Sequence, residues 1–307
     1  MLTKEIKLYE DRDDVTLTTY ITGKKGEVPG RRPAILICPG GAYFSCSDQE
    51  AEPVALRFSA MGYQTFVLRY STYLEGKGGF PDLFGEMPVK ESCLHPTPVR
   101  EVGKAMLIIR EYADEWMVDT DRIAVCGFSA GAHNAAMYSV YWHTPLLTDY
   151  FQVSEDCLKP AALILGYTLS DYVYMEEREK SPFDQAFFGA SNLALLGSRE
   201  NSEERLKEVS PCRLVSAKNP PTFLWATAQD QMVPVQHSLR MAHALADHRI
   251  PFEMHIFEEG PHGLSLADQS SALARSQIFP DAAKWTALAE AWLKKRFSLE
   301  LPEKTEF

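Results

Sequence analysis

The apolar positions of the chain follow two spacings, short runs typical of strands and longer stretches typical of helices. Strand-length runs occur at residues 6–9, 15–21, 34–38, 65–70, 122–127, 161–165, 222–227 and 252–257. The first two runs alternate polar and apolar residues, as half-exposed antiparallel strands do, whereas the later runs are almost continuously apolar, as strands covered on both faces are. The pattern therefore predicts a sheet of eight strands that is mostly parallel.

Helical spacing of the apolar residues appears between these runs. It occurs at residues 50–61, 99–116, 130–142, 235–246 and 282–297. Strands that alternate with helices form a parallel sheet flanked by helices, and the loops that follow the strands gather at their carboxyl ends. The predicted fold class is α/β, and we expect residues 1–307 to form a single domain.

Two segments interrupt this alternation. Residues 72–98 are rich in glycine and proline, and residues 167–210 form a long aromatic and acidic stretch that contains Phe183, Phe187 and Phe188. Both follow predicted strands, so both leave the sheet at its carboxyl edge. We expect insertions there that form a lid or a pocket wall, with solvated surface segments as the alternative.

One predicted strand passes directly into the next predicted helix through the sequence Gly127-Phe128-Ser129-Ala130-Gly131. A serine on such a sharp turn is pushed out of the sheet, and the glycines two residues to either side leave room for the turn. The pattern predicts a nucleophile elbow with Ser129 as the nucleophile.

A serine hydroxyl needs a neutral imidazole to accept its proton. Among the eight histidines, only His262 lies in a loop that follows a strand and is flanked by glycine and proline. Asp230 follows the preceding predicted strand, and parallel neighbouring strands would bring both residues to one edge. We therefore expect Asp230 to orient the imidazole. A helix cap is the alternative role of Asp230, and Asp171 and Asp247 are the fallback acids.

The order serine, acid, histidine is that of α/β-hydrolases. Together with the loop Pro39-Gly40-Gly41-Ala42-Tyr43, these motifs give a chain that resembles α/β-hydrolases of the acetyl esterase and lipase type, from about Arg32 to Leu266. It is similar to bacterial acetylxylan and feruloyl/acetyl esterase-like proteins. The sequence departs from many relatives at Ala42, where they have a third glycine, but this departure removes no backbone N–H.

The tetrahedral intermediate of acyl transfer needs preoriented N–H donors for its oxyanion. The amide of Ala130 directly follows the nucleophile at a helix N-terminus and is one candidate. The resemblance implies that Gly41 and Ala42 supply the others. His133 matches a histidine of the relatives, and we expect it to pack or hydrogen-bond rather than to act in catalysis.

The composition of the chain limits the classes of molecule that the protein is expected to bind. The net charge of −11 would repel nucleic acids and anionic membranes, and no uncharged run approaches the ~18 residues of a membrane span. Residues 1–14 lack the apolar core of a signal peptide. The six cysteines lack C-x-x-C spacing, which favours free thiols and a cytoplasmic protein, with a bridge between Cys38 and Cys46 as the alternative. We find no metal-ligand or dinucleotide motif and expect no cofactor.

These observations predict a serine carboxylesterase that hydrolyses short, acetyl-type esters through an acyl-enzyme. The resemblance implies acetylated sugars or xylo-oligosaccharides as its substrates. A peptidase or a lactone hydrolase on the same fold is the alternative, because a catalytic triad does not dictate the acyl donor. A non-catalytic hydrolase fold that only binds a ligand is the alternative of another class. The expected partner is a small-molecule ester, and a homo-oligomer is compatible with the sequence.

Overall fold

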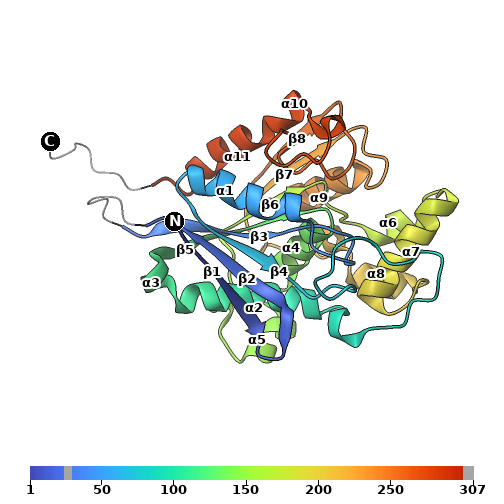
Figure 1. Cartoon of the computed structure of the whole chain (residues 1–307), viewed down its shortest axis with the longest axis horizontal. Coiled ribbons are helices and arrows are strands. Elements are labelled where there is room, and N and C mark those ends of the chain that lie inside the picture. Colours follow the sequence, from blue (N-terminus) through green and yellow to red (C-terminus); the bar gives the residue numbers. More distant parts are fainter. Residues whose placement is uncertain (24–29, 300–307) are drawn as a thin grey trace.

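The computed structural model describes residues 1–23 and 30–299, which form an eight-stranded sheet with helices on both faces (Figure 1). The strands follow one another across the sheet in the order β1-β2-β4-β3-β5-β6-β7-β8. Their bounds are Leu2–Tyr9 (β1), Arg12–Ile21 (β2), Arg32–Cys38 (β3), Gln64–Arg69 (β4), Val118–Phe128 (β5), Ala162–Gly166 (β6), Thr222–Thr227 (β7) and Phe252–Phe257 (β8). β2 pairs antiparallel with β1 and β4, and the other neighbours are parallel. The predicted mostly parallel sheet is confirmed.

The central strands are apolar throughout because each face of the sheet is covered. In β3, Ile35 and Ile37 pack into the core on one face, whereas Leu36 and Cys38 pack into the core on the other. All four side chains are fully buried. This alternation is the period of two that a strand imposes on its side chains.

Helices cover the two faces in separate layers. α1 (Glu52–Ala60) and α11 (Trp285–Lys294) pack on one face, and α2 (Thr97–Glu111), α4 (Ala130–Tyr141) and α9 (Gln236–Asp247) pack on the other. Figure 1 shows α1 and α11 on the side of the sheet opposite to α2. The remaining helices near the sheet are α3 (Ala113–Trp116), α5 (Pro145–Phe151) and α10 (Pro280–Ala283). Within the two described ranges, every helix is too short or too polar to cross a membrane.

The structure divides two of the predicted helices. The predicted helix at residues 99–116 becomes α2 and α3, with Tyr112 between them, and the one at residues 282–297 becomes α10 and α11. The apolar spacing continues through both breaks because the two parts of each pair bury side chains in the same core. The pattern therefore located the buried face but not the breaks in the backbone.

The segment of residues 167–210 contains three helices that the apolar spacing did not indicate. They are α6 (Tyr172–Glu177), α7 (Pro182–Leu196) and α8 (Glu203–Glu208), which lie together at one end of the molecule (Figure 1). In α7, nearly every residue from 187 to 196 is buried, so the helix lacks the polar face on which helical periodicity depends.

Candidate active site

Ser129 stands at the sharp junction of β5 and α4. Its φ of 51° is a left-handed conformation that residues with a side chain rarely adopt. The Ser129 N–H donates to the Gly166 carbonyl at 3.0 Å and holds this conformation. A Cβ atom on Gly127 would lie 2.3 Å from the Gly131 carbonyl oxygen, and one on Gly131 would lie 2.0 Å from that of Cys38. Only glycine fits at these two positions, so the local structure has the features of the predicted elbow.

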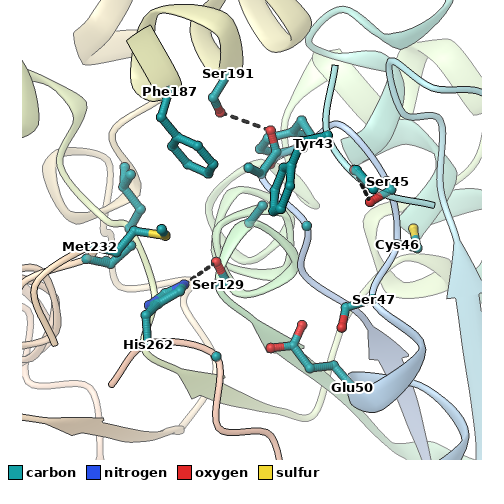
Figure 2. Close-up of a pocket in the computed structure, with 18 of the residues that line it drawn as sticks. Tyr43, Ser45, Cys46, Ser47, Glu50, Ser129, Phe187, Ser191, Met232 and His262 are labelled. Atoms are coloured by element: carbon teal, nitrogen blue, oxygen red, sulfur yellow. Dashed lines mark hydrogen bonds between the residues drawn. The ribbon is translucent and has the colours of Figure 1, made fainter. Parts of the chain in front are cut away.

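The structure brings the three predicted side chains together. Ser129 Oγ lies 2.7 Å from His262 Nε2, and His262 Nδ1 lies 2.7 Å from Asp230 Oδ2. Ser129, Asp230 and His262 follow β5, β7 and β8, whose parallel arrangement brings their carboxyl ends to one edge of the sheet. Figure 2 shows the Ser129 hydroxyl directed at the His262 ring.

Asp230 is buried and both of its oxygens have partners. Oδ1 accepts the N–H groups of Met232 at 3.0 Å and Val233 at 2.9 Å, which leaves Oδ2 for the imidazole. The residue that precedes α9 at its N-terminus is Val235, so Asp230 does not cap that helix.

The surroundings of His262 favour its protonated form. Burial lowers the pKa of the imidazole, but the charge and hydrogen bond of Asp230 and the charge of Glu50 together raise it above the ordinary value of 6.5. A base of this kind holds a proton more firmly than a free histidine does.

The loop that follows β3 carries the predicted oxyanion donors Gly41 and Ala42. The Gly40 carbonyl accepts the Ser47 N–H at 2.8 Å, and the Gly41 carbonyl accepts the Phe44 N–H at 2.9 Å. Because N–H and C=O point in opposite directions across a trans peptide, the N–H groups of Gly41 and Ala42 point away from the interior of the loop. We call residues 39–47 the glycine loop.

A cavity of about 460 Å³ opens beside Ser129 and His262. The three predicted oxyanion residues Gly41, Ala42 and Ala130 line it together with the serine. The remaining wall has an apolar part, made by Leu169, Tyr172, Phe187, Phe188, Met232 and Val233, and a polar part, made by Ser45, Ser47, Asp48, Gln49 and Glu50. Figure 2 shows Phe187 and Met232 on one side of Ser129, and Ser47 and Glu50 on the other.

Both unusual segments of the sequence contribute to this cavity. Phe187 and Phe188 of α7 line it, as do Gly79 and Phe80 from the segment of residues 72–98. Phe183 differs from its two aromatic neighbours because 51% of its surface is exposed and it does not line the cavity. Phe183 precedes Phe187 by one helical turn and stacks on the outer side of its ring, with centroids 6.1 Å apart.

His133 has a structural environment rather than a catalytic one. Its Nδ1 lies 2.5 Å from the Tyr43 hydroxyl, and its Nε2 lies 2.8 Å from the Val209 carbonyl oxygen. Burial lowers the pKa of His133 to about 4, so the ring is neutral near pH 7. The histidine connects α4 to Tyr43 of the glycine loop.

The fallback acids lie away from the imidazole of His262. Asp171 caps α6 and pairs with Arg213 at 2.9 Å, and Asp247 pairs with His243 at 3.1 Å on the exposed side of α9.

The alternative cysteine bridge is not formed, since Cys38 and Cys46 are both free thiols. Residues 1–23 and 30–299 contain no group of three or more His, Cys, Asp or Glu side chains that could hold a metal ion.

Two residues beside the site carried no functional prediction from the sequence. Glu50 belonged to the start of a predicted helix, and Tyr167 to the aromatic insertion. In the structure, the Tyr167 hydroxyl donates to Glu50 Oε1 at 2.5 Å. Their partnership joins distant parts of the chain, so no local pattern could have indicated it.

The chain is similar to several characterised hydrolases. It is 30% identical over 246 residues to endo-1,4-beta-xylanase B of Butyrivibrio fibrisolvens, a match that covers 78% of this chain and 33% of the relative. The chain thus spans well under two thirds of the curated relatives that it matches.

Solved structures match along nearly the whole chain. A carboxylesterase, Cest-2923 of Lactobacillus plantarum WCFS1, is 28% identical with a TM-score of 0.78, and the match covers 98% of this chain and 100% of that one. An acetyl ester-xyloside bifunctional hydrolase of Caldicellulosiruptor lactoaceticus is 29% identical with a TM-score of 0.71, covering 95% and 96%.

The BD-FAE family model matches residues 86–245, which is more than half of the chain. The comparisons confirm the predicted fold and the predicted resemblance to acetyl and carboxylic ester hydrolases. The chain therefore belongs to the BD-FAE family of α/β-hydrolases.

Proposed function

We propose that this protein is a serine carboxylesterase that hydrolyses short, acetyl-type esters. The observation that carries the proposal is the continuous contact from Ser129 Oγ through the His262 ring to Asp230, at 2.7 Å for each step. A serine in contact with an imidazole, itself held by a buried carboxylate, is the arrangement that activates a hydroxyl for acyl transfer.

The proposed reaction has two halves. Ser129 Oγ attacks the ester carbonyl while His262 Nε2 takes the hydroxyl proton, and that proton then passes to the departing alcohol as the C–O bond breaks. A water molecule next attacks the acyl-enzyme and gives a proton to His262, which returns it to Ser129 as the carboxylic acid leaves. Asp230 stabilises the imidazolium in both halves, and the N–H groups of Gly41, Ala42 and Ala130 stabilise the oxyanion.

We propose acetylated sugars or xylo-oligosaccharides as the natural substrates. One similar structure is that of an acetyl ester-xyloside bifunctional hydrolase, and one curated relative is named a xylanase. The polar part of the cavity wall, with Ser45, Ser47 and Gln49, offers hydroxyl and amide partners to the hydroxyl groups of a sugar.

A substrate panel tests this function. Acetylated xylo-oligosaccharides and aryl acetates are compared with amides and lactones that carry similar groups. We expect acetyl esters to be hydrolysed with the highest kcat/KM. Faster cleavage of amides or lactones would instead identify a peptidase or a lactone hydrolase.

We also propose a cytoplasmic location, which the six free cysteines support. Fractionation of the producing cells tests it, and recovery of the protein outside the cytoplasm would contradict it.

A further inference from the structure

Glu50 is a buried carboxyl group in the cavity wall that the proposed reaction does not use. It ends the short 3-10 helix η1 (Asp48–Glu50), and only 3% of its surface is exposed. Figure 2 shows its carboxyl group turned towards Ser129 and His262. A buried carboxylate is costly unless hydrogen bonds or an opposite charge compensate for lost hydration.

Burial raises the pKa of Glu50 above its ordinary value of 4.5, whereas its two hydrogen bonds and the charge of His262 act in the opposite direction and match the ionised form. Oε2 accepts the Gly40 N–H at 2.7 Å, and Oε1 accepts the Tyr167 hydroxyl at 2.5 Å. That hydroxyl already accepts the Ser265 N–H at 2.9 Å, so its own hydrogen is available for Glu50. Two oxygens that both accept are typical of a carboxylate rather than of a neutral acid.

These bonds join the glycine loop to residues 258–265, which follow β8 and which we call the histidine loop. The Ser265 hydroxyl donates to the Gln49 carbonyl at 2.6 Å, and the Gln49 amide donates to the Gly263 carbonyl at 2.9 Å. Gly263 directly follows His262. Residues 49 and 50 therefore fix the start of the glycine loop on one side and the backbone beside the base on the other.

Among the titratable groups that face Glu50, His262 is the one that can carry a positive charge, because the others are neutral near pH 7. The phenols of Tyr167 and Tyr70 and the thiol of Cys126 lie nearby, and burial raises the pKa of each, so all three are neutral near pH 7. In the described part of the chain, the charges that raise the pKa of His262 belong to Asp230 and Glu50. The Tyr167 ring meets the His262 ring edge to face, with centroids 5.0 Å apart.

We propose that Glu50 is a positioning residue that fixes the glycine loop through the Gly40 N–H and stabilises the imidazolium form of His262 by its charge. The proposal rests on the proposed esterase function. Glu50 would act twice in each turnover, whenever His262 carries the transferred proton.

The variant Glu50→Gln isolates the charge. A glutamine can still accept the Gly40 N–H with its oxygen and donate its NH₂ to Tyr167, so the loop keeps its anchor. We expect the apparent pKa in the pH profile of kcat/KM to fall by roughly 0.5 to 1 unit, and the plateau kcat to fall about three- to tenfold. KM should stay within about twofold, because the ground-state contacts remain.

Glu52→Gln is the matched control. It makes the same chemical change two residues further on, at an exposed position in the first turn of α1. We expect wild-type kinetics at every pH. The midpoint of thermal unfolding of each variant shows whether a loss of activity comes from a loss of fold.

Tyr167→Phe removes one hydrogen bond that favours the ionised form of Glu50, and it also removes the partner of the Ser265 N–H. We expect kcat to fall and the apparent pKa to fall by no more than it does in Glu50→Gln, which removes the charge outright. The proposal is overturned if Glu50→Gln leaves both the pKa and the plateau unchanged, or if Tyr167→Phe lowers the pKa more than Glu50→Gln does. If the wild type hydrolyses no ester, the proposed function fails instead, which is a separate outcome.

Discussion

Asp230 shows how one buried carboxylate can hold both a turn and a base. One oxygen binds two backbone N–H groups and the other binds His262. An asparagine could keep the turn through its carbonyl oxygen, but its NH₂ group would face Nδ1 of the imidazole and favour the wrong tautomer.

We therefore expect Asp230→Asn to fold normally and to lower kcat by about 10² to 10⁴. Asp247→Asn should be nearly silent, because Asp247 is exposed and pairs with the exposed His243. Steady-state kinetics with an acetyl ester measure both. The assignment of the acid would be wrong if Asp247→Asn were the impaired variant.

The pH profile reports the state of His262. The base must be neutral to accept the serine proton, so activity rises as His262 loses its proton. Asp230 and Glu50 hold its pKa above the ordinary value of 6.5, which moves this rise to higher pH. We expect kcat/KM to reach half of its plateau above pH 6.5. A midpoint well below pH 6 would contradict the conclusion that these two charges raise the pKa of His262.

The residues that the sequence could indicate carry their signal locally. Gly127 and Gly131 mark the elbow, and Asp230 and His262 directly follow apolar strands. Glu50 has no such mark, because its partner Tyr167 lies 117 residues away along the chain. Only the folded sheet brings these two together.

At the scale of elements, α7 forms the apolar end of the cavity. Phe187 packs edge to face against Phe44 and Phe80, with ring centroids 5.6 and 5.8 Å apart. The Ser191 hydroxyl of the same helix donates to the Ala42 carbonyl at 3.0 Å. The helix thus contacts the glycine loop directly and limits the room beside Ser129.

We propose that this helix sets the length of the acyl group. The wild type should lose roughly tenfold or more in kcat/KM from acetyl to octanoyl esters, because α7 limits the room beside Ser129 and the extra methylenes would have to displace the Phe187 ring. Phe187→Ala should reduce this difference by roughly tenfold. Phe84→Ala is the control, since 74% of the surface of Phe84 is exposed and it does not line the cavity, and it should keep the wild-type preference. Equal hydrolysis of acetyl and octanoyl esters by the wild type would contradict the proposal.

The sequence contains recognisable start and stop signals at the two ends of α7, although the residues between them show no helical spacing of apolar positions. The Ser181 hydroxyl accepts the Asp184 N–H at 3.1 Å, Pro182 occupies the first turn, and Gly197 ends the helix at a φ of 81°. These are ordinary start and stop signals. These signals did not lead to a predicted helix because α7 is apolar on most sides and shows no helical period. By contrast, α2 and α9 each expose a polar face, so their apolar spacing predicts them.

At the scale of the whole molecule, two separate cores fix the sheet between them. Trp225 of β7 and Trp285 of α11 stack with centroids 5.1 Å apart in one core, while Leu36 of β3 packs in the other. The indole N–H of Trp285 donates to the Ser265 carbonyl at 2.9 Å, so this core also holds the histidine loop. Alternating strands and helices allowed this layered fold to be predicted, because burial on both faces makes the strands continuously apolar.

The central claim is that Ser129 is the nucleophile, and covalent labelling tests it most directly. The protein is treated with a fluorophosphonate, and the modified peptide is identified by mass spectrometry. We expect one adduct, on Ser129, and neither an adduct nor more than about 10⁻³ of the wild-type kcat in Ser129→Ala. An adduct on another residue, or ester hydrolysis that persists in Ser129→Ala, would contradict the account.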